Sequence, residues 1–280
     1  MLRYEIDSVF LGLTIAEFFE KFHLSKKLIY LLKVNKDVFV NCENKNFDYC
    51  LKLGDILEID ETKYEFNNCV PWKNSLDIVY EDEDILIVNK PVNMLVHPDG
   101  NTDFTLNNIV SFYYQTIGLD RMPRHIHRLD FQTSGIVVYA KSFLVSSNLS
   151  WQLENGLIEK TYLALVENFK GDYLEINSKI ARDRHTNNKY MISKKGKDAI
   201  SIVKKIEEIN KKPLLEVKII TGRTHQIRVH LASVGSPIIG DNIYGGKISK
   251  EMFLHHYKIS FIHPRSLVRA EYVCKKEFKC

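Results

Sequence analysis

The spacing of hydrophobic residues at the start of the chain predicts a small unit of two helices and a short sheet. Apolar residues recur at the helical interval from residue 14, and a second helical run begins after Ser25, a favourable N-cap residue. Alternating segments at residues 38–40 and 55–59 then read as strands separated by turns. We therefore expect residues 1–68 to form a small α/β domain.

Beyond a linker rich in Asn and Pro, strand patterns outnumber helical ones. Strand candidates lie at residues 77–80, 85–88, 135–140, 160–166, 199–203 and 214–220. Helix candidates lie at residues 105–114, 144–155 and 224–234. The last two end at Gly156 and Gly235, which suit the left-handed position after a helix. Because strands and helices do not alternate strictly, residues 76–280 are expected to form an α+β domain with a mixed, largely antiparallel sheet.

Composition and charge permit nucleic-acid binding without demanding it. The 280 residues are 45% hydrophobic and 26% charged, as in an ordinary folded protein of two domains. The net charge is +4 and the isoelectric point about 8.6, below the values typical of dedicated nucleic-acid-binding domains. No apolar run is long enough to cross a membrane, so a membrane is not expected as a partner.

The cysteines indicate a reducing environment. Their number is odd and no two of them form a Cys-x-x-Cys pair; they are Cys42, Cys50, Cys69, Cys274 and Cys280. With no secretory leader at the start of the chain, this pattern predicts free thiols and a cytoplasmic protein. A zinc site from Cys42 and Cys50 was weighed, but their spacing does not match a zinc knuckle, so no metal is expected.

The segment Arg124-His-Ile-His-Arg-Leu-Asp-Phe-Gln-Thr-Ser-Gly135 carries the most unusual chemistry. It places cationic and titratable side chains and the carboxylate of Asp130 in a polar loop just before an apolar strand. A bland alternative is a surface ion pair between Arg128 and Asp130. A kinase catalytic loop is opposed by the inserted Leu129 and by the lack of a Gly-rich loop and an Asp-Phe-Gly sequence.

A second polar segment, Thr221-Gly-Arg-Thr-His-Gln-Ile-Arg-Val-His-Leu-Ala232, follows an apolar strand and opens a helix. Arg223 stands at the corner between strand and helix, where a guanidinium could bind a carboxylate bidentately. His225 and His230 are five positions apart, which does not place them on one zinc-binding face. The alternative is an amphipathic helix whose polar residues are only solvated.

Together these segments resemble the RluA-like pseudouridine synthase family. The blocks that carry the resemblance are His127-Arg-Leu-Asp-x-x-Thr-Ser-Gly-x-x-x-x-Ala-Lys141, Gly222-Arg-Thr-His-Gln-Ile-Arg-Val-His-Leu231 and Gly240-Asp-x-x-Tyr-Gly245. Weaker matches in the same order are Val88-Asn-Lys-Pro91 with Val96-His-Pro98, Lys160-x-Tyr162-x-Ala164, and Leu254-His with Phe261-Ile-His-Pro264. The resemblance extends from about residue 77 to residue 264.

This resemblance implies an isomerase that converts uridine to pseudouridine in structured RNA, with large-subunit ribosomal RNA favoured over transfer RNA. It implies a catalytic set of Asp130, with Arg223 paired to it and Tyr162 stacked on the target uracil. RNA contacts are expected from Arg128, which would replace the extruded nucleotide, and from His127, Thr133, His225, Gln226 and Arg228. No cofactor is expected, because the reaction involves no redox step and the sequence has no dinucleotide loop.

Residues 1–62 are similar to the S-four-like (alpha-L) RNA-binding domain, with lysines where that family prefers arginine. Lys26, Lys27 and Lys33 would give it a basic face for RNA phosphates, and a plainly solvated face is the alternative. The basic stretch at residues 182–197 could close on RNA or form a polar hairpin without contacts. RNA is the expected partner, and no protein partner is required, so a monomer is expected.

Two other classes of function fit the sequence less well. A catalytically silent RNA-binding or ribosome-assembly protein of the same fold has no evident need for Asp130, Tyr162 and Arg223 together. A hydrolytic glycosidase would require two carboxylates beside the scissile bond, and only one acidic residue stands out.

Overall fold

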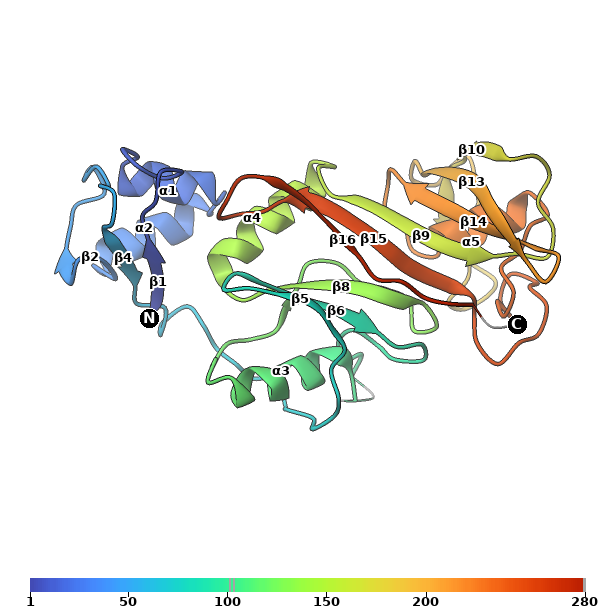
Figure 1. The fold of residues 1–280 in the computed structure, drawn as a ribbon, viewed down its shortest axis with the longest axis horizontal. Coiled ribbons are helices and arrows are strands. Elements are labelled where there is room, and N and C mark those ends of the chain that lie inside the picture. The colour runs from blue at the N-terminus through green and yellow to red at the C-terminus, as the bar shows by residue number, and fades with distance from the viewer. Residues whose placement is uncertain (101, 103, 279–280) are drawn as a thin grey trace.

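The computed structural model describes residues 1–100, 102 and 104–278, so Cys280 lies outside the described residues. A small N-terminal unit, blue in Figure 1, contains a four-stranded sheet in the order β1-β4-β2-β3. Its elements are β1 (Leu2–Glu5), α1 (Ile15–Lys21), α2 (Lys26–Val34), β2 (Val38–Val40), β3 (Glu43–Asn44) and β4 (Ile56–Ile59). Capping side chains start both helices: Thr14 accepts from the Glu17 amide, and Ser25 accepts from the Leu28 amide.

A long sheet forms the rest of the molecule, in the order β10-β13-β14-β9-β15-β8-β6-β5, with β16 beside β15 and β7 beside β8. Only β15 and β8 pair in parallel among these strands. The strands are β5 (Ile78–Glu81), β6 (Ile85–Lys90), β7 (Arg124–His125), β8 (Ser134–Ala140), β9 (Glu159–Leu165), β10 (Tyr173–Asn177), β13 (Ile200–Ile209), β14 (Lys212–Ile219), β15 (Leu254–Ile262) and β16 (Arg269–Val273). The α+β class with a mixed, mostly antiparallel sheet is thereby confirmed.

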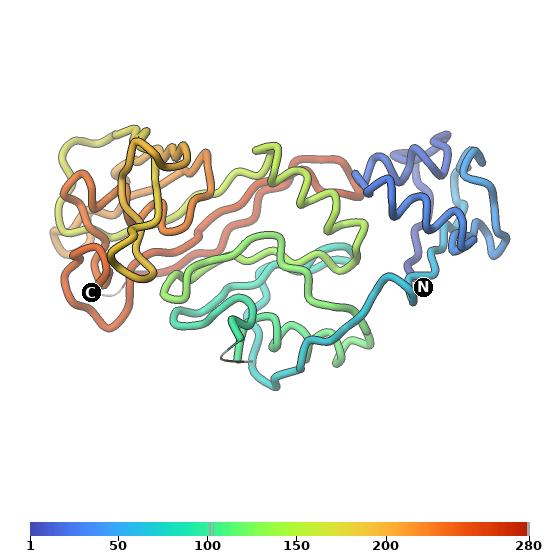
Figure 2. Tube along the Cα trace, turned by 180° about the vertical axis from the view of Figure 1, so that it is seen from behind, coloured from blue at the N-terminus to red at the C-terminus, as the bar shows by residue number. Residues whose placement is uncertain are grey.

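Three helices and a hairpin complete this part. They are α3 (Leu106–Thr116), α4 (Phe143–Glu154), α5 (Gln226–Ser233) and the two-stranded β11 (Ile180–Arg182) and β12 (Tyr190–Ile192). The views from both sides show the N-terminal unit at one end of an elongated molecule, and strands β10, β13 and β14 lie near the other (Figures 1 and 2). Among the described residues, no helix is long and apolar enough to cross a membrane.

The N-terminal unit packs directly on the long sheet. One hydrophobic cluster includes residues of both, such as Phe18 of α1 and Val138 of β8. The hydroxyl of Tyr4 donates to Asp84 at 2.8 Å, and the guanidinium of Arg265 lies over the Tyr4 ring. These contacts bury an aromatic hydroxyl with its hydrogen bond satisfied, which fixes the unit on the sheet.

Most predicted elements are present, and two details of the prediction were wrong. Gly156 and Gly235 do follow helices with positive φ, as predicted. The predicted helix at residues 224–234 is shorter, because His225 adopts a left-handed conformation immediately before it. Strand β15 was not predicted, although it lies between β9 and β8 near the middle of the sheet.

Candidate active site

A cleft of about 1030 Å³ opens over the middle of the long sheet. The loop between β7 and β8, strand β9 and the segment that enters α5 supply its walls. Its polar lining includes Arg128, Asp130, Lys160, Tyr162, Arg223 and Arg228. Residues that are far apart in the sequence thus meet in one concave site.

Asp130 lies in the loop that leads into β8, and a buried lysine supports this loop. The Lys90 ammonium donates to the carbonyls of Pro91 at 2.9 Å, Met94 at 2.7 Å and Phe131 at 3.2 Å. The pKa of Lys90 is lowered to about 7. Burial lowers it, and the negative charge of Asp130 opposes this effect only in part. Lys90 therefore ties the residue after Asp130 to the end of β6.

The start of β8 has a close backbone contact that only glycine permits. Gly135 has φ +114, and a Cβ there would lie 2.3 Å from the carbonyl oxygen of His256 on β15. The parallel pairing of β8 with β15 begins at this point. Gly135 therefore lets the two strands meet directly below the Asp130 loop.

Arg228 holds the Asp130 carboxylate. Its Nη1 donates to Oδ2 of Asp130 at 3.2 Å, while Nε and Nη2 bind the buried Asp241 at 2.7 and 2.9 Å. Burial alone would lower the pKa of Arg228, but the hydrogen bond and charge of Asp241, together with Asp130, raise it. A permanently charged guanidinium therefore faces Asp130 from the start of α5.

His225 is the second neighbour of Asp130. Its Nε2 lies 3.7 Å from Oδ2 of Asp130, and its Nδ1 lies 2.9 Å from the hydroxyl of Tyr244. Burial lowers the pKa of His225, an effect that the negative charge of Asp130 opposes. The carboxylate thus sits between an imidazole and a guanidinium from the same turn.

The expected ion pair between Arg223 and Asp130 was wrong. Arg223 is exposed, and its Nε donates to the backbone carbonyl of Asp198 at 2.9 Å. Arg223 lies outside α5, which begins at Gln226 directly after the left-handed residue His225. Arg228, one turn into the helix, takes the carboxylate that was assigned to Arg223.

Tyr162 on β9 lies in the cleft wall with one ring face covered. The ring of His256 on β15 stacks on it, with centroids 4.5 Å apart, and His127 meets His256 edge to face. Burial raises the pKa of Tyr162, and the charge of Asp130 adds to this effect. The tyrosine is therefore a neutral, rigidly backed ring.

Several expected RNA-contacting residues are used by the fold instead. The amide of Gln226 is buried and bonds to Ile200, Ser201, Thr221 and the Arg223 amide. Because these contacts use both its donors and its acceptor, Gln226 has no capacity left for RNA, and that prediction was wrong.

Thr133, His127 and Arg228 are also buried. The Thr133 amide donates to the Asp130 carbonyl at 3.0 Å, which closes the turn after the carboxylate. Both ring nitrogens of His127 are buried without a hydrogen-bond partner among the described residues, and burial lowers its pKa. Although these three side chains are buried, they line the cleft, and their contact with RNA stays a prediction.

Of the side chains expected to contact RNA, four are exposed cations: Arg128 at the cleft, and Lys26, Lys27 and Lys33 on α2. Arg128 lies 3.3 Å from the ring of His97 and lines the cleft. Its position at the rim is compatible with the predicted role of displacing a nucleotide. The three lysines are exposed on the N-terminal unit, as their predicted role requires.

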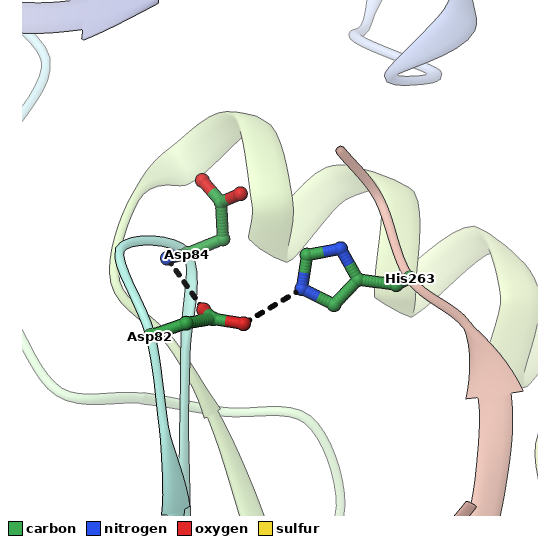
Figure 3. A group of neighbouring side chains, drawn as sticks. All are labelled: Asp82, Asp84 and His263. Atoms are coloured by element: carbon green, nitrogen blue, oxygen red, sulfur yellow. Dashed lines mark hydrogen bonds and ion pairs between the residues drawn. The ribbon is translucent and has the colours of Figure 1, made fainter. Parts of the chain in front are cut away.

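One group of potential metal ligands lies at the turn between β5 and β6, where Asp82, Asp84 and His263 come together (Figure 3). Asp84 is already bound by Arg265 at 2.6 and 3.1 Å and by Tyr4, and His263 lies 3.0 Å from Asp82. The guanidinium supplies the positive charge that a cation would bring, so this group is a structural ion-pair network.

Three supporting residues were not singled out from the sequence. Asp241 and Tyr244 lie in the Gly240-Asp-x-x-Tyr-Gly245 block. The carboxylate and the hydroxyl of this block are the sequence features that could have marked them as functional. Lys90 lies in the Val88-Asn-Lys-Pro91 block. A lysine at the end of an apolar strand is the sequence feature that could have marked it as functional. Each acts through a neighbour of Asp130, which no spacing along the chain reveals.

Comparison with protein families gives two matches. Residues 84–233 match the RNA pseudouridylate synthase family, and residues 2–57 match the N-terminal domain of the RluD ribosomal pseudouridine synthase. The first match includes Asp130, Tyr162 and Arg228. The second covers the N-terminal unit up to β4.

Individual relatives agree with these matches. The chain is 38% identical over 247 residues to the uncharacterized RNA pseudouridine synthase YhcT of Bacillus subtilis, covering 86% of this chain and 82% of that protein. It is 33% identical over 266 residues to ribosomal large subunit pseudouridine synthase D of Haemophilus ducreyi, covering 91% of this chain and 78% of that protein.

The fold is similar to that of human RNA pseudouridylate synthase domain containing 1. The TM-score is 0.63 at 24% identity, over 74% of this chain and 86% of the human one.

Proposed function

The chain belongs to the RNA pseudouridine synthase family, and from this premise we propose that it isomerises specific uridines of large-subunit ribosomal RNA, with Asp130 as its catalytic carboxylate. The class of reaction is that of the family: an intramolecular transfer that converts uridine in RNA to pseudouridine. The choice of ribosomal RNA is supported by the relatives named as large-subunit enzymes.

The observation that carries the proposal is the environment of Asp130. The carboxylate reaches a cleft large enough for a nucleotide; Arg228 holds it at 3.2 Å, and Nε2 of His225 lies 3.7 Å from it. The Arg228 guanidinium orients the carboxylate toward the cleft, where a carboxylate can act as a nucleophile or as a base. Three first steps are compatible with this arrangement: attack on the uracil ring, attack on the ribose, or proton abstraction from the ribose.

The other side chains of the cleft fit the remaining requirements. The target must leave the RNA stack at a cost of a few kcal/mol, and the exposed Arg128 is suited to fill the space it vacates. Tyr162 offers a ring on which the uracil can stack, worth about 1–3 kcal/mol. The exposed Arg223 is suited to a backbone phosphate. The reaction is redox-neutral, so we propose that no cofactor takes part.

The N-terminal unit would add affinity through its basic helix. Lys26, Lys27 and Lys33 are exposed on α2 and can contact phosphates without reading sequence. We also propose the division that the sequence predicted, an RNA-binding domain at residues 1–68 and a catalytic domain at 76–280. A monomer without a protein partner is proposed, in the cytoplasm, which suits the free thiols of Cys42, Cys50 and Cys274.

The test is pseudouridine mapping of total RNA from cells with and without this gene. Loss of signal at one or a few uridines of large-subunit ribosomal RNA is the expected result. Loss confined to transfer RNA would overturn the substrate and keep the reaction. If no site changed, and the purified protein also failed on unmodified ribosomal and transfer RNA, a silent RNA-binding role would replace the proposal.

A further inference from the structure

The half-buried tyrosine Tyr244 contacts both neighbours of Asp130. Its hydroxyl lies 2.9 Å from Nδ1 of His225, and its ring lies under the guanidinium of Arg228, 5.1 Å from the centroid. The same hydroxyl accepts the backbone N–H of Tyr190 on β12 at 2.9 Å. Tyr244 therefore stands behind the site, with no direct contact to Asp130 among the interactions of the described residues.

The donors and acceptors around the Tyr244 hydroxyl determine which nitrogen of His225 carries the proton. A phenol has one hydrogen to donate, and a neutral imidazole has one donor and one acceptor nitrogen. The Tyr190 amide already donates to the phenolic oxygen, and the acceptor within reach of its hydrogen among the described residues is Nδ1 of His225. Donation by Tyr244 leaves the ring proton on Nε2.

The opposite side of the ring supports the same assignment. Nε2 lies 3.7 Å from Oδ2 of Asp130, within the range seen for catalytic hydrogen bonds that are still long in the absence of substrate. A proton on Nε2 points at the carboxylate and is attracted by it, whereas a lone pair there would repel it. The alternative tautomer would also leave the Tyr244 hydrogen without an acceptor among the residues that the structure describes. Both ends of the imidazole thus select the Nε2–H form.

We propose that Tyr244 is a positioning residue that fixes His225 as the Nε2–H tautomer, so that His225 donates toward Asp130 throughout the reaction. The inference rests on the proposed role of Asp130 and adds a residue that acts through another. Arg228 then supplies one donor to the carboxylate and His225 the second. Both are held from behind, Arg228 by Asp241 and His225 by Tyr244.

The backbone gives His225 little freedom to choose another arrangement. It has φ +56, a left-handed conformation that is costly for a residue with a Cβ, immediately before α5. Its ring also meets the ring of Tyr190 edge to face, with centroids 5.4 Å apart. The imidazole thus lies between Tyr190, Tyr244 and Asp130, which restrict its orientation. The choice of tautomer is then the remaining freedom of the ring.

Nitrogen NMR of the ring tests the proposal without requiring activity. The full chain is labelled with ¹⁵N-histidine, and the His225 signals are assigned by their absence in His225→Gln. Above neutral pH, the wild type should show a protonated Nε2 and an unprotonated Nδ1, and Tyr244→Phe should move the ring toward a mixture. A wild-type ring protonated on Nδ1, or an unchanged tautomer in Tyr244→Phe, would overturn the proposal even if the RNA substrate were misassigned.

Kinetics provide the second arm, with an unmodified large-subunit ribosomal RNA transcript as the probe. Tyr244→Phe should lower the single-turnover rate constant roughly tenfold to a hundredfold at an unchanged half-saturating RNA concentration, as for other partners that orient a histidine. The same substitution in a His225→Gln background should cost almost nothing further. Equal losses in both backgrounds would show that the hydroxyl acts by another route. Tyr173→Phe, at an exposed tyrosine of β10, is the matched control.

Discussion

Nη1 of Arg228 donates to Oδ2 of Asp130 at 3.2 Å, across 98 positions of sequence. Nε and Nη2 of the same guanidinium donate to Asp241, which is fully buried. One planar group therefore connects a structural carboxylate to one that faces the cleft. The orientation of Asp130 consequently depends on the fork geometry of arginine as well as on its charge.

Arg228→Lys keeps the positive charge but loses the fork. A single ammonium cannot reach Asp130 and also bind Asp241 with two hydrogen bonds. The single-turnover rate constant for pseudouridine formation should fall by at least about a hundredfold, equivalent to ~2.7 kcal/mol. Arg3→Lys, at an exposed arginine of β1, is the control. Near wild-type turnover in Arg228→Lys would show that charge alone suffices.

Arg223→Ala should be much milder. Because Arg223 is exposed and bound to a backbone carbonyl rather than to Asp130, its removal should spare the chemical step. We expect a several-fold higher half-saturating RNA concentration and a rate constant within about threefold of wild type, since a phosphate contact supports binding. Steady-state kinetics on the same transcript measure both. A loss of rate comparable to that of Arg228→Lys would contradict the assignment.

Deprotonation of Lys90 is expected to lower the rate constant at alkaline pH. Burial lowers the pKa of Lys90 to about 7, so its proton is lost near neutrality rather than near its usual 10.5. The neutral amine has one donor fewer and releases one of the three carbonyls that hold the Asp130 loop. The rate constant should therefore decline as the pH rises through about 7. The pKa of His225 is lowered by burial, which places its own titration on the acid side of this limit.

Folding stability should show the opposite trend over the same interval. The unfolded chain keeps the lysine proton up to about pH 10.4, and the folded protein releases it near 7, so stability gains with pH between these values. Urea unfolding and single-turnover rates across this range measure the two effects. Lys90→Met should lack both. An unchanged rate up to about pH 9 in the wild type would contradict the role of the ammonium.

The basic face of α2 can be tested without deleting the N-terminal unit. Deletion would expose the hydrophobic cluster that this unit shares with the long sheet, so loss of folding would obscure any loss of binding. Replacement of Lys26, Lys27 and Lys33 by Gln leaves that cluster intact. Each lost phosphate contact should reduce the slope of log affinity against log salt concentration by about 0.7–0.9. An identical slope in the variant and the wild type would show that these lysines are solvated and make no phosphate contacts.

The fold class could be predicted from the sequence because most strands carry continuous or alternating apolar patterns. Strand β15 escaped prediction because His255 and His256 occupy buried positions and break that pattern. Their burial is possible because the ring of each bonds to a backbone carbonyl, of Cys274 and Ile136 respectively. Tertiary contacts of this kind cannot be read from periodicity.

The candidate site could be predicted in part. Asp130 and Tyr162 were located by their motifs, and the structure places both in the cleft. The partner of Asp130 was misassigned because Arg223 and Arg228 belong to one segment, and only the helix start at Gln226 decides which of them faces the carboxylate. The same uncertainty of a few residues at helix ends explains why the amide of Gln226 was expected to be accessible.

Asp130→Asn tests the central claim most directly. The amide has nearly the shape of the carboxylate but lacks its charge, so it removes nucleophile and base alike. The purified variant should form no pseudouridine on an unmodified large-subunit ribosomal RNA transcript, while its affinity for that transcript stays within a few-fold of wild type. Retained turnover in Asp130→Asn would contradict the account.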